Sequence, residues 1–484
     1  MKLKKIAALL ATAGAASSAF ATNGMDMEGY GPVATGMGGA SYAYDNGTAG
    51  LINNPATLAF IPAGTARLDI AVGGLHPDVT SSMPGMPGAK SGGTAYYMPA
   101  IGYVRKTGSF GYGVGLMSQG GMGTEYGDNP LLSNGYSMMG NPTASGQSNR
   151  SELGVGRVMI PLTFDVSDKL SLGGTLDYVW GGLDIQMVMS GQMFNAFATP
   201  GGTPLGSATG TMVSNLPAVM GAFHISDVNW AQFDFSQGTN KMKQSLTTTG
   251  WAGNFGFLWK AAPGISIGGV YHAKTSLGDM EGHGTLKMNA MTPAGAMTVP
   301  ITGNLKVVDF QWPETYGIGV AFQVNDQLML AADYKRIGWA DAMKNFSMSF
   351  VADATQTDPA AQGMVGLGAN ALNATLVQNW KNQDVLMIGA SYKMSPALTL
   401  RAGANLANNP IPDEYMNPLF PAIVKNHYTA GFGYGFSPVS SIDFAFSYAP
   451  EVTATNSNMC AAAGVCMTTK HSQTNWQLMY SQRF

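Results

Sequence analysis

The sequence is short of charge. Of 484 residues, 25 are Lys or Arg and 28 are Asp or Glu, so 11% are charged, against about 25% in an ordinary soluble domain. A water-soluble protein with so little charge would have a sticky surface. The formal net charge of −3 offers no basic stripe for nucleic acid. Since 45% of the chain is still hydrophobic, the composition indicates a protein that is not surrounded by water alone.

Long apolar runs are missing as well. No segment after the N-terminus has 18 consecutive apolar residues, so the sequence predicts no transmembrane helix. Residues 1–21 read instead as a cleaved signal peptide. Lys2, Lys4 and Lys5 precede an apolar stretch, and Ala19-Phe20-Ala21 supplies the small residues of a cleavage site. The alternative, a membrane anchor, would need an apolar core of roughly 20 residues, and this one has about 11.

Cysteine and metal-binding patterns are scarce. The chain has two cysteines, Cys460 and Cys466, which flank a short loop, and a disulfide between them suits an exported protein. A metal pair is the alternative, but no His or acidic cluster accompanies them. The six His residues show no metal spacing, so we expect neither a metal nor a cofactor. His427 has no recognisable Ser or Asp partner, which argues against an enzyme.

What the chain does have is alternation of apolar and polar residues. At the C-terminus, Trp476, Leu478 and Tyr480 alternate with Gln477 and Met479, which is the period of a β-strand. The same pattern predicts about 14 strands, an even number. They lie near 66–76, 94–106, 109–119, 151–166, 169–188, 251–262, 265–288, 300–322, 327–351, 380–394, 396–406, 423–436, 440–452 and 474–484.

A soluble β-sandwich would alternate too, with its apolar face inward. Here the polar faces are small and weakly charged, and aromatic residues stand near the strand ends. Both features favour a barrel with lipid outside and interfacial aromatic girdles. The fold class is therefore all-β, a transmembrane antiparallel β-barrel over residues 63–484, in a Gram-negative outer membrane.

Long connections alternate with short turns, and the two longest are 119–150 and 189–250. Loops of this length in a compact fold are usually binding loops or lids. Methionine, a flexible side chain that adapts to apolar ligands, gathers around them. The candidate ligand-binding residues are Met117, Met122, Met138, Met139, Met187, Met189, Met193, Met212 and Met220. Simple filling of the fold is the alternative reading of these methionines.

Residues 22–62 do not fit the strand pattern. Frequent glycines interrupt them, yet apolar Leu51, Ile52 and Leu58 need burial. A barrel of intermediate size leaves room inside, so we expect an N-terminal hatch that plugs the lumen. The alternative is a disordered tail, which would have no use for apolar residues.

Two strand irregularities are predicted. Gly111, Gly113 and Gly115 face inward on the third strand, where glycine marks a kink or a close approach. Either a lateral opening or room for the hatch would explain them. Strict alternation would turn Glu314 toward lipid, so we expect a bulge at Pro313 that brings Glu314 inward.

Several motifs together resemble the FadL/TodX family of outer-membrane transporters of hydrophobic compounds. Asn54-Pro55-Ala56 is similar to the family's hatch motif, and the resemblance runs in order along the mature chain. Its other parts are Gly36 to Ala40, Asp45-Asn46, His76 to Val79, Trp312-Pro313-Glu314, Tyr316-Gly317, Tyr334, Trp339, Arg401 to Gly403, Asn409 to Pro412 and Phe484.

The resemblance implies a monomeric barrel with a hatch. It implies capture of long-chain fatty acids or similar lipids by the outer loops, a lumenal pocket, and sideways exit beside a kinked strand. Aromatic or aliphatic hydrocarbons are the alternative ligands, since few cations lie near the Met-rich loops. Lys344 is the possible head-group cation. A general diffusion porin is a second alternative. The expected partners are hydrophobic small molecules and outer-membrane lipid or lipopolysaccharide, and no nucleic acid.

Overall fold

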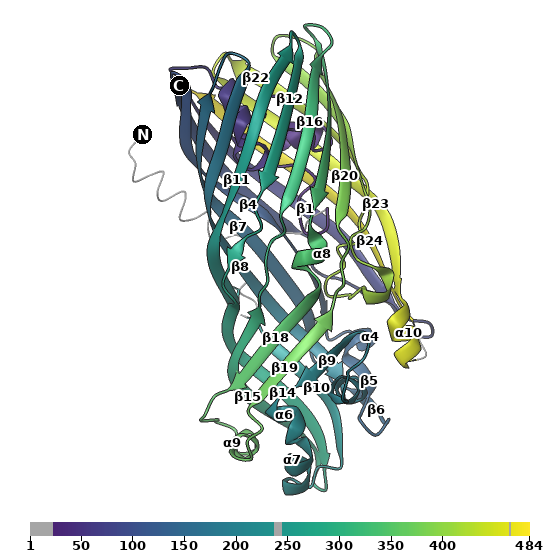
Figure 1. The fold of residues 1–484 in the computed structure, drawn as a ribbon. Helices are drawn as coiled ribbons and strands as arrows, with labels where there is room; N and C mark the ends of the chain where they lie inside the picture. The colour runs from purple at the N-terminus through teal and green to yellow at the C-terminus, as the bar shows by residue number, and fades with distance from the viewer. Residues whose placement is uncertain (1–22, 237–243, 464–465) are drawn as a thin grey trace.

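The computed structural model describes residues 23–236, 244–463 and 466–484. It shows long, tilted strands wound around a common axis, with short turns at one end and extended loops at the other (Figure 1). We call these the turn end and the loop end. The predicted signal peptide, residues 1–21, lies outside the described residues. In the described part of the chain, no helix is long and apolar enough to cross a membrane.

The wall is a closed circle of antiparallel strands. In order around the circle they are β1 (Ala66–Ser82), β3 (Tyr96–Thr107), β4 (Phe110–Gly127), β7 (Asn149–Asp165), β8 (Leu170–Ser190), β11 (Leu246–Ala262), β12 (Ile265–His272), β16 (Thr315–Gln323), β17 (Leu328–Ile337), β20 (Gln383–Lys393), β21 (Leu398–Ala407), β22 (His427–Ser437), β23 (Ser440–Asn456) and β24 (Met467–Arg483). β24 pairs with β1 along its length, from Arg67 with Arg483 to Ser82 with Thr468. The predicted closed antiparallel barrel is confirmed.

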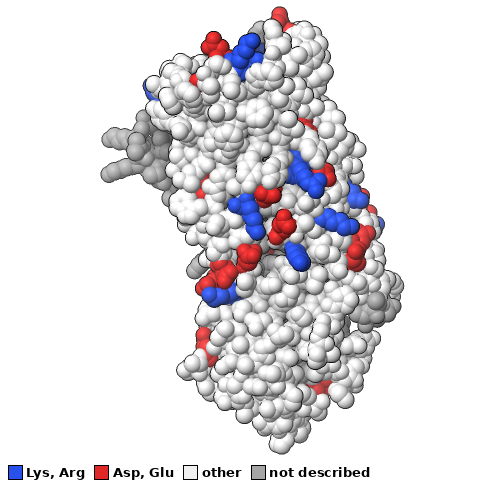
Figure 2. Space-filling model, viewed as in Figure 1, with Lys and Arg blue, Asp and Glu red and all other residues white. Residues whose placement is uncertain are grey.

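Alternation gives the wall its two faces. Tyr316, Ile318, Val320 and Phe322 of β16 are exposed on the outside, as expected for strands against lipid. On the face drawn in Figure 2, charged side chains gather in a belt across the middle and leave wide uncharged areas above and below. An exposed ion pair of 2.9 Å joins Arg336 and Asp384, at the loop ends of β17 and β20.

The strand number needs correction. Among the described residues the sheet contains 22 strands, more than the about 14 predicted from alternation. Breaks in three predicted strands add four, and four further strands form in connections where none was predicted. Residues 265–288 divide into β12, β13 (Ser276–Leu277) and β14 (Met280–Thr292). Residues 300–322 divide into β15 (Gly295–Val308) and β16, and residues 327–351 into β17, α8 (Trp339–Ala342) and β18 (Asn345–Ala352). At one break Asp309 has a φ of 53°, and Pro313 has no N–H to offer a ladder.

Beyond the breaks, the chain builds an extension at the loop end. β14, β15, β18 and β19 (Ala371–Val377) continue the sheet, together with β9 (Gly206–Thr209) and β10 (Asp227–Phe235). The other elements here are β2 (Ala89–Lys90), α4 (Pro130–Ser133), β5 (Asn134–Tyr136), β6 (Pro142–Ala144), α5 (Gly191–Ala198), α6 (Thr211–Ser214), α7 (Leu216–Ala222), α9 (Pro359–Gly366), η3 (Asp413–Tyr415) and α10 (Ser457–Ala463). The described parts of the long connections are therefore folded structures.

Residues 23–61, which we call the N-terminal segment, lie within the circle of strands (Figure 1). They form α2 (Pro32–Gly36), η1 (Gly47–Ala49), α3 (Gly50–Asn53) and η2 (Pro55–Phe60). α2 contacts β21 to β24, η1 contacts β1 and β3, and η2 contacts β7, β8 and β11. Met25, Met37 and Leu51 are fully buried, so the apolar residues of this segment find their core inside the barrel.

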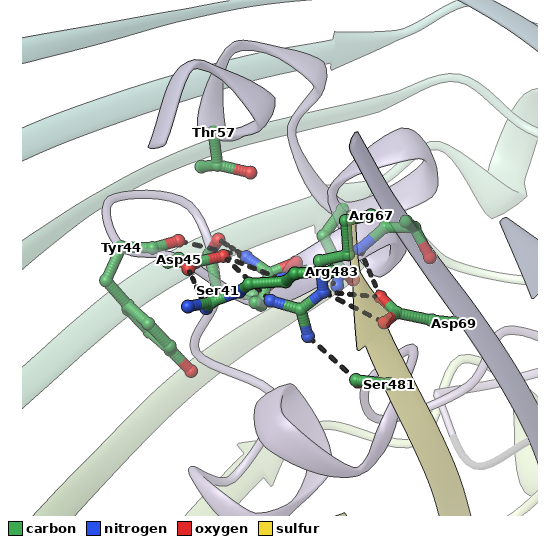
Figure 3. A network of polar contacts seen from close by, with 12 residues as sticks. Ser41, Tyr44, Asp45, Thr57, Arg67, Asp69, Ser481 and Arg483 are labelled. Atoms are coloured by element: carbon green, nitrogen blue, oxygen red, sulfur yellow. Dashed lines mark hydrogen bonds and ion pairs between the residues drawn. The ribbon is translucent and has the colours of Figure 1, made fainter. Parts of the chain in front are cut away.

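Polar contacts anchor the N-terminal segment to the wall. Asp333 accepts hydrogen bonds from the backbone N–H groups of Ser41 at 2.6 Å and Tyr42 at 2.9 Å. In the network of Figure 3, Arg67 of β1 donates to Asp69 at 2.8 Å and lies 3.7 Å from Asp45 of the segment. These bonds fix two separate points of the segment against opposite stretches of wall.

Gly38 and Gly64 test how tightly the segment is held. Both have positive φ, 70° and 84°, which costs an added side chain about 1 kcal/mol. A Cβ on Gly38 would also meet the Ala404 oxygen at 2.5 Å, whereas a Cβ on Gly64 meets nothing within 4 Å. We predict that Gly38→Ala releases the segment, seen as faster proteolysis and hydrogen exchange of residues 23–61. Gly64→Ala is the matched control, and equal protection in the two variants would contradict the close docking.

Candidate ligand-binding site

A large cavity of about 790 Å³ lies among the elements at the loop end. α5, the ends of β8, β23 and β24, and the connections around residues 83–86, 131–144 and 415–419 enclose it. We call it the outer cavity. Its volume is within the range of about 300–1,000 Å³ that small-molecule sites occupy.

The lining of the outer cavity is uncharged. Its described residues include no Asp, Glu, Lys, Arg or His. Methionine dominates it, through Met83, Met86, Met187, Met189, Met193, Met416, Met459 and Met467. Phe197, Leu131, Leu205 and Leu376 add further apolar surface, and Asn134, Gln192 and Asn456 supply a few uncharged polar groups. Such a lining binds an apolar ligand by contact area and adapts to its shape.

The predicted methionines divide between several places. Met187, Met189 and Met193 line the outer cavity. Met117 lines a smaller cavity described below. Met122 and Met212 are buried, Met138 and Met220 pack partly buried against the core, and Met139 is 73% exposed. The sequence did not predict Met83, Met86, Met416, Met459 and Met467, because they lie outside the two longest connections, 119–150 and 189–250.

Lys344 does not belong to the cavity. Its side chain is exposed, and it is not among the residues that line the outer cavity. Its backbone oxygen accepts hydrogen bonds from the N–H groups of Gln378 and Asn379, at 3.1 and 2.9 Å. The expectation of a head-group cation at this position is wrong for the outer cavity.

A carboxylate holds one wall of the cavity in place. Asp227, on β10, accepts hydrogen bonds from the Ser137 hydroxyl, the Met139 N–H and the Asn141 amide. Partial burial disfavours the charged carboxylate and by itself would raise the pKa of Asp227. The three hydrogen-bond donors stabilise the charged form more strongly, so the pKa is lowered. The loop they fix joins β5 and β6, whose Tyr136 and Pro142 line the cavity.

Another connection folds inward and forms the floor of the cavity. Residues 408–426, between β21 and β22, bury Phe420, Ile423 and Val424. Met416, Pro418 and Leu419 line the cavity, and the oxygen of Pro418 accepts a hydrogen bond from the Tyr126 hydroxyl at 3.1 Å. This inward loop therefore closes one side of the outer cavity.

The wall has an unpaired stretch where β3 and β4 separate. Their pairing runs from Thr107 with Phe110 to Ala100 with Met117 and then stops, while β3 continues to Tyr96 beside β1. β4 bulges between Ser118 and Gly120, where its register with β7 shifts. We call the stretch between residues 96–99 of β3 and 118–125 of β4 the β3–β4 window.

Groups from inside the barrel satisfy the freed backbone of the window. The Tyr30 hydroxyl donates to the Gln119 oxygen at 2.7 Å, and the Gly121 N–H donates to the Met25 oxygen at 3.1 Å. Arg157, itself paired with buried Asp177, donates to the Gln119 side chain at 2.5 Å. A cavity of about 40 Å³ lies at the window, between the N-terminal segment and strands β1, β3, β4 and β24.

The three glycines of β4 serve packing and lie before the bulge. A Cβ on Gly113 would meet the Tyr103 oxygen at 2.0 Å, and one on Gly115 would meet Leu51 of the N-terminal segment at 2.4 Å. Gly111 would meet the Thr163 hydroxyl at 2.3 Å. All three stand in the paired part of β4, so these residues give close approach, and the irregularity comes at Gln119.

The orientation expected for Glu314 is wrong. The Tyr271 hydroxyl donates to the Glu314 carboxylate at 3.2 Å, and Tyr271 and Tyr316 are exposed on the outer wall. The chain does leave the strand pattern around Pro313, but the residue it turns inward is Trp312, which is 2% exposed. The chain therefore buries the larger apolar side chain and leaves the carboxylate beside two phenols.

The Asn54-Pro55-Ala56 motif fastens η2 to the wall. Asn54 accepts from the Ala56 N–H at 3.0 Å and so caps η2, in which Pro55 occupies the first turn. The Asn54 amide donates to the oxygens of Tyr42 and Phe257, at 2.8 and 3.1 Å.

Elsewhere, the structure joins Cys460 and Cys466 in a disulfide beside the outer cavity.

A closed sheet with an apolar exterior, filled by its own N-terminal segment and topped by a Met-lined cavity, is a membrane β-barrel of the transport kind. Residues 8–484 match the model of the family described as outer membrane protein transport protein (OMPP1/FadL/TodX). The chain belongs to this family of outer-membrane transport channels, whose members are not enzymes.

Solved relatives share the whole architecture. The toluene transporter TodX of Pseudomonas putida is 28% identical, with a TM-score of 0.78, over 95% of this chain and 99% of that one. The toluene transporter TbuX of Ralstonia pickettii is 27% identical, with a TM-score of 0.72, over 94% and 99%. A FadL homologue of Pseudomonas aeruginosa, 16% identical over 95% and 99% with a TM-score of 0.65, shares the fold.

A curated relative extends the likeness to part of another chain. An uncharacterized protein from the phosphoenolpyruvate carboxykinase gene 5′ region of Chlorobium limicola is 39% identical over 104 residues. The match spans 22% of this chain and 51% of that relative, so it covers about half of the relative's length.

Asp227 gives a testable link between charge and the cavity wall. We predict that Asp227→Asn weakens the docking of residues 134–144 by about 2 kcal/mol, because hydrogen bonds to a charged acceptor are lost. Hydrogen exchange of this loop should accelerate, and that of the variant Asp128→Asn, an exposed position, should not.

The same carboxylate sets a pH dependence. Its folded pKa is depressed, so its contribution is complete above the unfolded pKa of about 4 and is lost as the pH falls through the lower folded value. Loop protection in the wild type should be constant between about pH 8 and 5 and should decline below about pH 4. A decline that begins near neutral pH would contradict this assignment.

Proposed function

We propose that the protein is an outer-membrane uptake channel for neutral apolar small molecules, hydrocarbons and alkylbenzenes above all. The observation that supports this ligand class is the outer cavity, which is lined by methionine and contains no charged residue among those described. Transfer of apolar surface into such a cavity is favourable by about 25 cal/mol per Å².

Long-chain fatty acids fit the outer cavity less well. An ionised carboxylate loses its hydration on entry and needs a cation or several donors to replace it. Among its described lining residues, the cavity offers a few amides and hydroxyls and no Lys or Arg. The two relatives named as toluene transporters, 28% and 27% identical to this chain, favour the hydrocarbon over the fatty acid.

The N-terminal segment would act as the hatch of this channel. It lies inside the circle and is anchored at Asp333, Arg67 and the Asn54 motif. Inward residues 408–426 add a second barrier below the outer cavity. This filling is unlike the open, charge-lined lumen of a general diffusion porin, so we expect little passage of hydrophilic solutes.

The β3–β4 window would be the exit. It is the place where β3 and β4 leave each other unpaired, and the 40 Å³ cavity reaches it from the inside. A ligand that leaves sideways stays in apolar surroundings and avoids the water beyond the turn end. The loop end would then face outward from the cell and the turn end the periplasm.

Matched ligands test the proposed ligand class. We predict that purified protein in liposomes takes up toluene at least about tenfold faster than benzoate at pH 7. The benzoate carboxylate finds no cation in the outer cavity's described lining, and a missing ion pair of more than about 1.4 kcal/mol corresponds to at least about a tenfold difference. Uptake is measured with labelled ligands, and protein-free liposomes give the passive rate. Equal facilitated rates, or a preference for benzoate or octanoate, would count against the proposal.

Deleting Gln119 tests the exit. Without this residue the bulge disappears and β4 regains the register that would let it run straight beside its neighbours. We predict that toluene still binds with wild-type affinity, while its transport into liposomes falls at least about tenfold. The control is Gln327→Ala, an exposed position in the turn between β16 and β17, which leaves both the window and the outer cavity intact. Unchanged transport in the deletion variant would exclude the window as the exit.

A further inference from the structure

The inner face of β24 connects the two cavities. Its alternate residues from Met467 to Ser481 are buried. Met467 lines the outer cavity, and Gln477 and Met479 line the small cavity at the window. The residues between them on this face are all uncharged and polar: Thr469, His471, Gln473 and Asn475. A ligand that moves from one cavity to the other along this wall would pass them.

Midway along this face lies a group of polar side chains with unused hydrogen-bonding atoms. Both ring nitrogens of His427, Oγ of Ser447, Nε2 of His471 and Oε1 of Gln473 have no hydrogen-bond partner within the described residues. All four side chains are at most 1% exposed. We call them the inner polar cluster. A buried polar group without a partner is destabilising. The presence of several such groups in one place therefore points to a ligand that pairs with them.

The strand register brings the four side chains together. Tyr428 pairs with Tyr448, and Ala449 pairs with Gln473, so His427 and Gln473 lie on either side of the small residue Ala449. His471 is the next inward residue on β24, and Ser447 the next on β23. His427 and Gln473 each directly oppose Ala449, at the spacing of about 5 Å between neighbouring strands. The cluster therefore spans three adjacent strands around an alanine.

The existing hydrogen bonds decide which atoms accept. Nδ1 of His471 lies 2.7 Å from the oxygen of Pro421, and since a carbonyl only accepts, Nδ1 carries the proton and Nε2 is left as an acceptor. The Gln473 amide nitrogen donates to Asn475 at 2.8 Å, which leaves its oxygen as an acceptor. His427 and Ser447 can each donate and accept.

Only certain chemical groups match this pattern. Two free acceptors need an O–H or N–H donor from the ligand. An ionised carboxylate has none and would also approach the Glu28 carboxylate, which accepts a bond from Asn475 at 3.3 Å. A hydrocarbon has no polar group at all. A hydroxyl donates to His471 or Gln473 and accepts from His427 or Ser447, so it fits both roles.

We propose that the inner polar cluster is a binding site for the hydroxyl group of an apolar ligand, a phenol or an alcohol, on its way from the outer cavity to the window. This inference rests on the proposed function and refines its substrate class. The outer cavity admits neutral apolar molecules by shape, and the cluster retains those that bear a hydroxyl.

His427→Leu tests the proposal with little risk to folding. His427 makes no hydrogen bond to the described protein, and leucine replaces a buried unpaired group with an apolar one. Equilibrium dialysis of the purified full-length protein measures toluene and p-cresol, which differ by one hydroxyl. We expect about tenfold weaker binding of p-cresol in the variant, the equivalent of one lost hydrogen bond, and unchanged binding of toluene. Ser447→Ala should change binding in the same direction.

Thr163→Val is the matched control, because the hydroxyl of Thr163 is also buried and unpaired but lies on β7. This variant should bind toluene and p-cresol as strongly as the wild type does. If His427→Leu leaves p-cresol binding unchanged, or weakens both ligands equally, the inference is overturned while the proposed function stands. If the wild-type protein binds neither toluene nor p-cresol, the proposed function fails, and the inference with it.

Discussion

The pairing of backbone hydrogen bonds within a closed sheet is the constraint on which the rest of this structure depends. In a membrane no water can satisfy an open strand edge, so the circle must close, as β24 does on β1 from Arg67 to Ser82. Where strands break or part, other groups replace the ladder. Gln311 accepts from the Leu277 N–H at 2.8 Å and donates to its oxygen at 2.9 Å. At the window, Tyr30 and Met25 do the same for β4. The N-terminal segment thus completes the wall's hydrogen bonding as well as filling its interior.

The few charged side chains are distributed unevenly between the barrel interior and the outer cavity. Inside the barrel several of them form ion pairs, such as Arg157 with Asp177 at 2.8 Å and Lys335 with Asp26 at 3.2 Å. A buried pair gives little net stability, but each partner alone would be strongly unfavourable. Lys335 therefore fixes where Asp26, and with it the start of the N-terminal segment, can lie. The described lining of the outer cavity contains no charged side chain, and this separation lets one chain combine a polar interior with an entrance for apolar ligands.

The sequence predicted the wall well because alternation reports directly which side chains face lipid. Its strand positions coincide with the circle, apart from three strands that break. The sequence did not predict those breaks because the alternation resumes beyond them. A positive φ, as at Asp309, does not change the hydropathy pattern. The bulge at Gln119 was missed for a related reason, since the glycines before it are the more visible signal. Lys344 and most cavity methionines depend on how loops fold back on each other, and such long-range contacts have no period along the chain.

The two binding environments along the proposed route, the apolar outer cavity and the inner polar cluster, differ in rigidity, and this difference bears on selectivity. The outer cavity is built largely from loops and methionine side chains, which change rotamer easily and tolerate varied shapes. The inner polar cluster stands on β22, β23 and β24, where the strand ladder holds each Cα in register. Rigid strands can discriminate by one hydrogen bond, because a misplaced donor cannot be accommodated by movement of the site. A channel with an adaptable entrance and a fixed interior would therefore select its ligands after capture, so affinity at the loop end and rate of passage need not follow the same order among ligands.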